Sequence, residues 1–240
     1  MVYQNGERHA LELAHRNGRL WAAGGPDQAP EWFTGLDSRP VLEIEPLALG
    51  PSKPLSEATL RRIQGEVAAR HERDQEALRK KVTDQDEPGE VATVTAENTA
   101  YLVALVQEVG WIDRARFGLE TAHRATVLAQ HSDHLPLGLA ALPGVEKDFK
   151  GAADSPETYP IFVDWLRLAL GQCQIYGSRI ELDMEGDPVL APLEDPERVD
   201  ERRATQGLPP LDEYLALAAK YLFKGRAVRR EPGSSHGELH

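Results

Sequence analysis

A long run of helix-forming residues, from Ser56 to about Val82, constrains the fold of this chain most. The run is rich in Arg, Glu, Ala and Leu, contains no proline, and starts with a Ser56/Thr59 pattern typical of a helix N-terminus. Further runs with helical periodicity follow, and glycine or proline ends most of them. They span residues 96–109, 117–134, 157–170, 195–205 and 211–223, with a short helical turn at 137–141. The sequence therefore predicts a mainly α fold (α-rich α+β) of five to seven helices.

Extended structure is predicted at the N-terminus and at one place among the helices. Asn17-Gly18 separates two apolar stretches and favours a type I′ hairpin, and residues 39–49 form a second extended stretch. A small β element is expected at residues 174–182. We therefore divide the chain into a β-rich or irregular extension (1–54), a helical domain (55–223) and a tail (224–240). The tail lacks apolar periodicity and is expected to be disordered.

Charge and motif content exclude several classes of protein. With 27 Lys and Arg against 39 Asp and Glu, the net charge is −12, which argues against a nucleic-acid or membrane partner, because binding phosphates needs a cationic surface. No stretch approaches the roughly 20 apolar residues of a membrane span. A single cysteine, Cys173, fits a cytoplasmic protein and a packing role. Glycine-rich phosphate loops and a serine-hydrolase elbow are absent, so no cofactor is predicted.

The helix predicted at residues 117–134 carries the strongest candidate chemistry. A neutral imidazole takes or gives a proton near neutral pH, which makes His131 the best acid–base candidate. Gln130 lies beside it, and Asp133 is a carboxylate able to fix the imidazole tautomer. Two alternatives stay open: the polar stripe is simply the solvated face of the helix, or the stripe binds a metal ion. The metal ligands would then be His131 and His134, which are three residues apart as are Glu120 and His123, and which of the three histidines binds stays open.

Short motifs in a fixed order, from about Arg73 to Tyr214, resemble the bacterial domain-of-unknown-function family 6624. They are Asp74-Gln75 with Arg79, Asn98-Thr99, Gly110-Trp111, Gly118, Gln130-His131 with Asp133, Asp164, Gln174 with Tyr176-Gly177, Glu194-Asp195-Pro196, Arg202-Arg203, and Gly207-Leu208-Pro209 before Leu211 and Tyr214. The chain departs from the family pattern at Trp165, which replaces an arginine, and at Ser178-Arg179, which replaces Thr-Gln. The resemblance does not itself imply an activity.

The resemblance selects polar residues for a single converging site. The catalytic residues are His131 and Asp164, with Asp164 or Asp133 orienting the imidazole, and Gln130 and Asp195 as further orienting residues. The substrate-binding residues are Gln75, Asn98, Gln174, Tyr176, Arg179 and Arg203, with Arg203 binding an anionic group. We expect a bacterial cytoplasmic enzyme, in specialised metabolism, that acts on a polar small molecule or peptide without a metal. The alternatives are a metal-dependent enzyme using the helix histidines and a non-catalytic ligand- or partner-binding protein.

Overall fold

The structure is a computed structural model that describes residues 47–83, 85, 87–132 and 134–230. It also describes five strands that precede residue 47, the last of which ends at the buried Ile44. This part of the chain contains eight α-helices and, among them, a small antiparallel hairpin, which confirms the α-rich prediction. The helices fall into two compact units, one containing Glu43–Asp148 and the other containing the residues from Phe149 onward. Each unit is described by itself.

The five N-terminal strands form two small sheets. Strand β1 (Val2–Gln4) pairs antiparallel with β2 (Glu7–His9). The second sheet has the order β3-β4-β5, formed by β3 (Leu11–Arg16), β4 (Arg19–Gly24) and β5 (Val41–Ile44). Strands β3 and β4 lie on either side of residues 17–18, as the hairpin prediction requires, while those two residues lie outside the described part. Strand β5 falls within the second predicted extended stretch.

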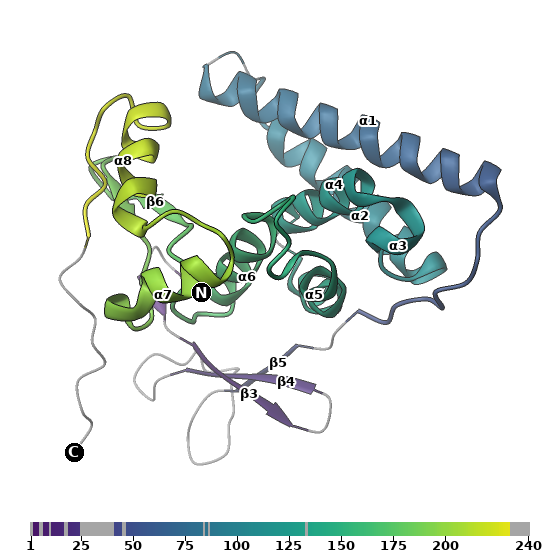
Figure 1. Cartoon of the computed structure of the whole chain (residues 1–240), viewed down its shortest axis with the longest axis horizontal. Helices are drawn as coiled ribbons and strands as arrows, with labels where there is room; N and C mark the ends of the chain where they lie inside the picture. Colours follow the sequence, from purple (N-terminus) through teal and green to yellow (C-terminus); the bar gives the residue numbers. More distant parts are fainter. Residues whose placement is uncertain are drawn as a thin grey trace. The chain divides into compact units, whose positions relative to one another are not determined.

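The first helical unit is built around α1 (Glu57–Val82), which packs against α2 (Glu90–Val109) and α4 (Leu119–His131) (Figure 1). Ser56 caps α1 as predicted, because its Oγ accepts a hydrogen bond from the backbone N–H of Thr59 at 3.2 Å. Helix α2 begins six residues before the predicted position 96.

Two helices of this unit differ from the sequence prediction. The run at 117–134 is divided at Gly118, whose φ of 82° belongs to the left-handed region, into α3 (Arg114–Phe117) and α4. A full helix, α5 (Leu135–Phe149), replaces the short turn expected at 137–141, although Pro143 lies inside it. Its apolar stripe explains this difference, because burial of that stripe outweighs one missing backbone hydrogen bond. The stripe consists of the fully buried Leu137, Ala141, Val145 and Phe149.

The second unit contains α6 (Thr158–Ala169), close to its predicted bounds, and the remaining short elements. These are β6 (Ile180–Leu182), β7 (Pro188–Leu190), the 3₁₀ turn η2 (Pro196–Arg198), α7 (Val199–Thr205) and α8 (Leu211–Tyr221). The apolar core between them consists of Leu190, Val199, Leu211 and Leu215. The β element is shorter than the predicted 174–182, because residues 174–179 form a loop held by distant side chains.

Residues 226–230 fold back onto the β6–β7 hairpin. The backbone N–H of Arg229 donates to the carbonyl of Pro188, and the N–H of Leu190 donates to the carbonyl of Arg229, both at 2.8 Å. Val228 packs against the apolar core of the unit. The prediction of a disordered tail is therefore wrong for this segment, while residues 231–240 lie outside the described part.

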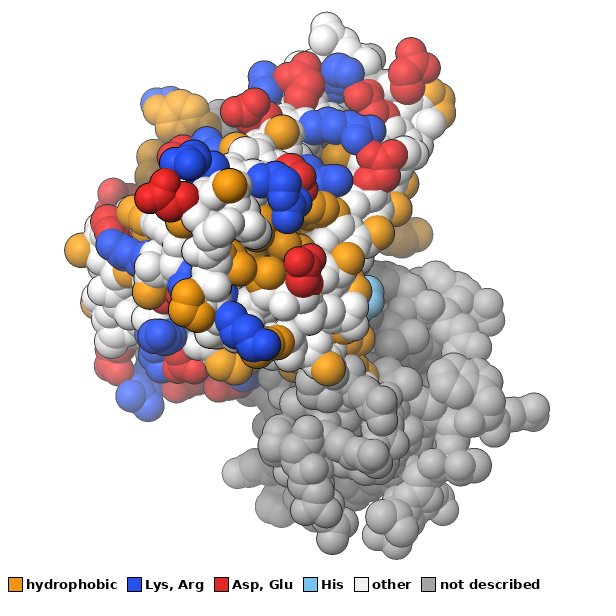
Figure 2. Space-filling model, turned by 90° about the vertical axis from the view of Figure 1, so that its right-hand side faces the viewer, with side chains coloured by type: hydrophobic (Ala, Val, Ile, Leu, Met, Phe, Trp, Pro, Cys, Tyr) orange, Lys and Arg blue, Asp and Glu red, His pale blue; other side chains and the backbone are white. Residues whose placement is uncertain are grey.

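The surface carries mixed charge. On the face in Figure 2, basic side chains alternate with acidic ones and do not gather in one patch. Exposed ion pairs such as Arg61–Glu57 and Arg62–Glu66, both at 3.1 Å, follow the i, i+4 spacing of α1 and contribute about 0.5 kcal/mol or less each. None of the described helices is both long and apolar enough to cross a membrane.

Candidate functional site

A histidine–carboxylate pair joins the two helices α1 and α4. The Nδ1 atom of His131 lies 2.8 Å from Oδ2 of Asp74, although the two residues are 57 positions apart in the sequence. Asp74 is only 3 % exposed, whereas the His131 side chain is 27 % exposed. A buried carboxylate needs hydrogen-bond donors, and the Nε2 of Gln75 supplies a second one at 3.1 Å from the same oxygen.

This geometry defines what the imidazole can do. When Nδ1–H donates to the carboxylate, the ring is held in the tautomer whose Nε2 carries the free lone pair. In the described part of the chain, no hydrogen bond occupies that Nε2. A carboxylate at Nδ1 also stabilises the positive charge that forms when Nε2 takes up a proton. The pair is therefore arranged for proton transfer at Nε2.

His71 lies one turn before Asp74 on the same helix and is partly buried. Burial, followed by the Arg124 cation, lowers the pKa of His71, and the Asp74 carboxylate opposes this effect. The direction of this pKa shift favours a neutral imidazole at neutral pH. The Asp74 carboxylate therefore contacts the imidazole of His131 and has the imidazole of His71 as a second neighbour.

Other predicted site residues lie on the same three helices. Asn98 of α2 is 2 % exposed, and its Oδ1 accepts from a guanidinium nitrogen of Arg70 at 3.5 Å, while its Nδ2 has no hydrogen-bond partner. Gln130, next to His131 on α4, is also buried. Asp133 lies outside the described residues. The first unit thus carries Gln75, Asn98, Gln130 and His131 on helices that pack against one another.

The metal-binding alternative involves His134, which has a structural contact of its own. Its Nδ1 accepts a hydrogen bond from the backbone N–H of Leu137 at 3.1 Å, in the first turn of α5. The proton of the neutral ring is then on Nε2, so neither nitrogen offers a free lone pair to a metal ion. Among the residues that the structure describes, no group of three or more His, Cys, Asp and Glu side chains is arranged to hold a metal.

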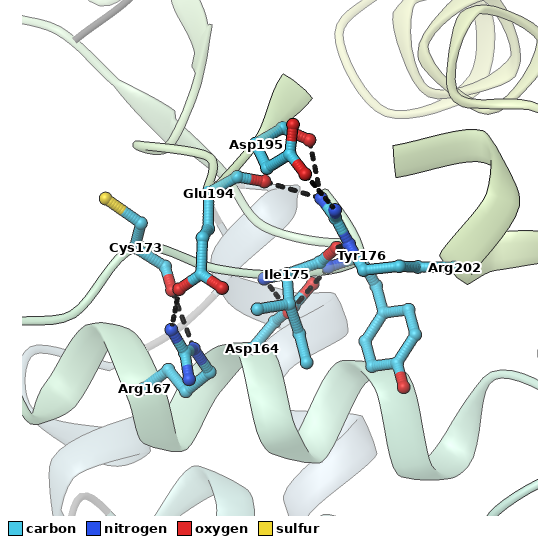
Figure 3. A network of polar contacts seen from close by, with 8 residues as sticks. All are labelled: Asp164, Arg167, Cys173, Ile175, Tyr176, Glu194, Asp195 and Arg202. Atoms are coloured by element: carbon cyan, nitrogen blue, oxygen red, sulfur yellow. Dashed lines mark hydrogen bonds and ion pairs between the residues drawn. The ribbon is translucent and has the colours of Figure 1, made fainter. Parts of the chain in front are cut away.

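The second unit holds another polar cluster, which we call the Asp164 network (Figure 3). The fully buried Asp164 of α6 accepts four hydrogen bonds: its Oδ1 from the backbone of Ile175 and Tyr176 at 2.8 and 3.0 Å, and its Oδ2 from the backbone and hydroxyl of Ser178 at 2.9 and 2.8 Å. Burial raises the pKa of Asp164, and the hydrogen bonds oppose that rise. Asp164 therefore holds the loop 175–178, and the carboxylate bonded to His131 is Asp74 instead.

Gln174 and Arg203 are also committed to the protein backbone. The amide of Gln174 donates to the carbonyls of Ala191 and Arg179 at 2.8 and 3.1 Å and accepts from the N–H of Arg179 at 2.8 Å. Arg203 is 2 % exposed and donates to the carbonyls of Pro209 and Tyr176, both at 2.7 Å. The guanidinium predicted to bind an anionic group is thus buried and bound to neutral carbonyls.

The remaining predicted residues of this unit also have structural contacts. Tyr176 packs edge-on against Tyr159, with ring centroids 6.2 Å apart, and burial raises its pKa to about 12. Its ring points away from Arg202 and Asp195 (Figure 3). Asp195, predicted as an orienting residue, is exposed, has a left-handed φ of 42° and makes no side-chain cap to the 3₁₀ turn that follows it. Burial, followed by Glu194, raises the pKa of the Cys173 thiol, which fits its packing role.

Asp74 is a site residue that the sequence places only in the motif Asp74-Gln75, without a predicted role. The signal lies in the helical spacing: positions 63, 67, 70, 74 and 77 share one stripe of α1. Ile63, Val67 and Ala77 of that stripe are buried. Asp74 and Arg70 are its charged members, and a carboxylate buried among such apolar side chains needs a hydrogen-bond partner.

The fold and the site define an α-rich protein in which a partly exposed histidine of α4 pairs with a buried carboxylate of α1. A family model matches residues 61–224, so the chain belongs to a family of unknown function, DUF6624. This match confirms the resemblance drawn from the motifs between residues 73 and 214, and it includes both the Asp74–His131 pair and the Asp164 network. Searches of curated proteins and of solved structures gave no match.

Proposed function

We propose that this protein is a bacterial cytoplasmic enzyme in which His131 acts as general acid and base on a polar small molecule or peptide. The observation that carries the proposal is the 2.8 Å contact between Nδ1 of His131 and the buried Asp74. A partly exposed imidazole backed by a buried carboxylate is a recurrent arrangement for proton transfer. In this proposal Asp74 is a positioning residue and Nε2 of His131 meets the substrate.

A non-catalytic ligand- or partner-binding protein is the second candidate. The Asp164 network supports it, because the carboxylate of Asp164 and the guanidinium of Arg203 are both hydrogen-bonded to the loop 175–178. Polar residues that connect segments in this way are typical of a structural frame. The two candidates differ in what His131 does, so the test is directed at that residue.

The test compares variants for consumption of metabolites. Wild-type protein and His131→Asn are incubated with a small-molecule extract, and consumed compounds are identified by mass spectrometry. Asparagine places its amide nitrogen near the position of Nδ1, so it still donates to Asp74 but has no Nε2 to carry a proton. We expect turnover of any consumed compound to fall by roughly 10²–10⁴-fold. Asp74→Asn is expected to act in the same direction, because the charge behind the ring is removed.

The matched control is His123→Asn on the same helix, because the hydrogen bonds of the Asp74 side chain go to His131 and Gln75. It should consume the same compounds at the wild-type rate. Equal loss in His123→Asn, reversed by added divalent metal, would favour the metal-dependent alternative. Wild-type turnover in a folded His131→Asn protein would contradict the role of His131. No consumption of any compound by the wild-type protein would favour the non-catalytic candidate.

A further inference from the structure

One arginine of α1 differs from its neighbours in its partners. The helix carries five arginines, and four of them form ion pairs: Arg61 with Glu57, Arg62 with Glu66, Arg73 with Glu97 and Arg79 with Glu76. In the part of the chain that the structure describes, Arg70 has no carboxylate within ion-pair distance. Its guanidinium instead lies over the ring of Tyr101 at 4.0 Å and contacts Oδ1 of Asn98.

Asn98 provides an unpaired donor beside this cation. Arg70 has only N–H donors, so the amide oxygen of Asn98 is the atom that contacts it, and the amide nitrogen is the other arm of the same planar group. That nitrogen is buried and has no hydrogen-bond partner among the described residues. An unpaired buried donor is unfavourable, and a ligand oxygen would pair it. A negatively charged acceptor would therefore satisfy both the Arg70 guanidinium and the Asn98 amide nitrogen.

Tyr101 keeps the cation in place. Asn98 and Tyr101 are three residues apart on α2 and share one face of that helix. The aromatic ring fixes the plane of the guanidinium by stacking and leaves the in-plane N–H groups free for a ligand. The Tyr101 hydroxyl is also buried without a hydrogen bond of normal geometry, and Glu66 is its carboxylate neighbour. The amide of Asn98, rather than this hydroxyl, is the donor on which the inference depends.

The position of the cation relates it to the histidine pair. Arg70 and Asp74 are four residues apart on α1, so their side chains leave the same face about 5–6 Å apart at Cβ. We propose that Arg70 and Asn98 bind a carboxylate group of the substrate, one helical turn from the Asp74–His131 pair. That the bound carboxylate belongs to a substrate rests on the proposed function, whereas the binding of a carboxylate at Arg70 and Asn98 does not depend on it. This site takes the anion-binding role that the sequence analysis gave to Arg203.

Charge balance favours a carboxylate over a phosphate. The site has one unpaired cation, and the Asp74 and Glu66 carboxylates lie nearby on the same helix. A monoanion matches one guanidinium, whereas a phosphate dianion would add repulsion from these carboxylates. The planar fork of an arginine also fits the two oxygens of a carboxylate.

The test is a titration of the ¹⁵N-labelled full chain followed by NMR. Sodium acetate is added, with sodium chloride at equal ionic strength as reference and inorganic phosphate as a separate arm. The side-chain amide signals of Asn98 should shift saturably with acetate and less with phosphate. Arg70→Gln should weaken acetate binding by about tenfold or more, whereas the exposed control Arg73→Gln should leave it unchanged.

A second variant keeps the test informative if Arg70→Gln folds poorly. Asn98→Leu removes a donor that is unpaired among the described residues, together with the long 3.5 Å contact to Arg70, so its stability should change little. Acetate binding, followed in this variant by the backbone amide signals of α1 and α2, should be lost. Amide signals that ignore acetate would overturn the proposal and indicate a buried water as the partner of Nδ2. Stronger binding of phosphate than of acetate would overturn the choice of ligand. Loss of turnover in His131→Asn is measured separately, so failure here leaves the proposed function intact.

Discussion

At the scale of single residues, His71 gives the stability of the protein a defined dependence on pH. Burial and the Arg124 cation lower the pKa of its folded-state imidazole below the usual value of 6.5. As the pH falls through about 6.5, the imidazole of His71 is protonated in the unfolded chain but stays neutral in the folded protein. The unfolded state then binds more protons than the folded state. The free energy of unfolding therefore decreases as the pH is lowered from about 6.5, and the stabilising contribution of the neutral His71 is fully present at higher pH.

We therefore expect His71→Gln to lose less stability than the wild type between about pH 7 and about pH 5. The measurement is urea unfolding at several pH values, with His123→Gln as the comparison variant. Both variants replace one histidine by glutamine, so a difference between them reports on the position of the histidine. An identical pH dependence in wild type and His71→Gln would contradict the assignment of this effect to His71.

For the histidine site, the sequence predicts His131 itself but not the carboxylate that contacts it. His131 was predicted because helical spacing and motif order both selected it, and Asn98 and Gln75 followed from motif order. The partner of His131 was predicted as Asp164 or Asp133, whereas the structure pairs it with Asp74. A contact between residues 57 positions apart depends on how α1 and α4 pack, which no local pattern records.

At the scale of elements, the Asp164 network fixes the loop between α6 and β6. Asparagine at position 164 has one acceptor oxygen instead of two, so two of the four hydrogen-bond donors from residues 175–178 would face an N–H group. We expect Asp164→Asn to lower the free energy of unfolding by about 2–4 kcal/mol. Ser178→Ala removes only one donor and should cost about 0.5–1.5 kcal/mol.

Chemical denaturation of both variants measures this difference. Equal, small losses would show that the loop does not depend on the carboxylate. A folded Asp164→Asn protein with wild-type stability and lost turnover would restore Asp164 as a catalytic residue, which was its predicted role. The two readouts therefore separate a structural from a catalytic carboxylate.

Elements governed by local signals were predicted well, and those governed by packing were not. Helix α1 has a cap and α6 is followed by Gly171, both have helical periodicity in their own sequence, and their bounds were close. Pro143-Gly144 indicates a break, yet α5 continues through it. A side chain at Gly144 would come within 2.2 Å of the Trp111 ring, so this glycine permits close packing there. The segment 174–179 resembles a strand in sequence and makes backbone hydrogen bonds at its two ends. The N–H groups of Ile175, Tyr176 and Ser178 between them donate to the Asp164 side chain instead.

At the scale of the whole molecule, the polar residues expected to converge in one site belong to two compact units. The family match runs through both, so family membership does not distinguish which cluster carries the function. Geometry does distinguish them. Asp164 accepts four hydrogen bonds from its own loop, whereas among the described residues the first unit leaves an imidazole nitrogen and an amide nitrogen without hydrogen-bond partners and the Arg70 guanidinium without a carboxylate.

The C-terminal segment tests how much of the chain the second unit needs. A chain ending at Arg230 keeps Val228 and the two backbone hydrogen bonds between Arg229 and the β6–β7 hairpin. A chain ending at Phe223 loses both hydrogen bonds, at about 1 kcal/mol each, and the apolar contact of Val228, at about 1 kcal/mol. The exposed ion pair of Arg226 with Asp187, at 3.7 Å, adds little.

We therefore expect the free energy of unfolding of the chain ending at Phe223 to be about 2–3 kcal/mol lower than that of the full-length protein. The chain ending at Arg230 should have the same free energy of unfolding as the full-length protein. Hydrogen exchange gives a local readout, because the amide of Leu190 donates to the carbonyl of Arg229. That amide should lose protection in the chain ending at Phe223 and keep it in the chain ending at Arg230. Unchanged protection in the shorter chain would mean that the hairpin holds without the segment. The amide of Arg179, which donates to Gln174 inside the Asp164 loop, serves as the internal reference.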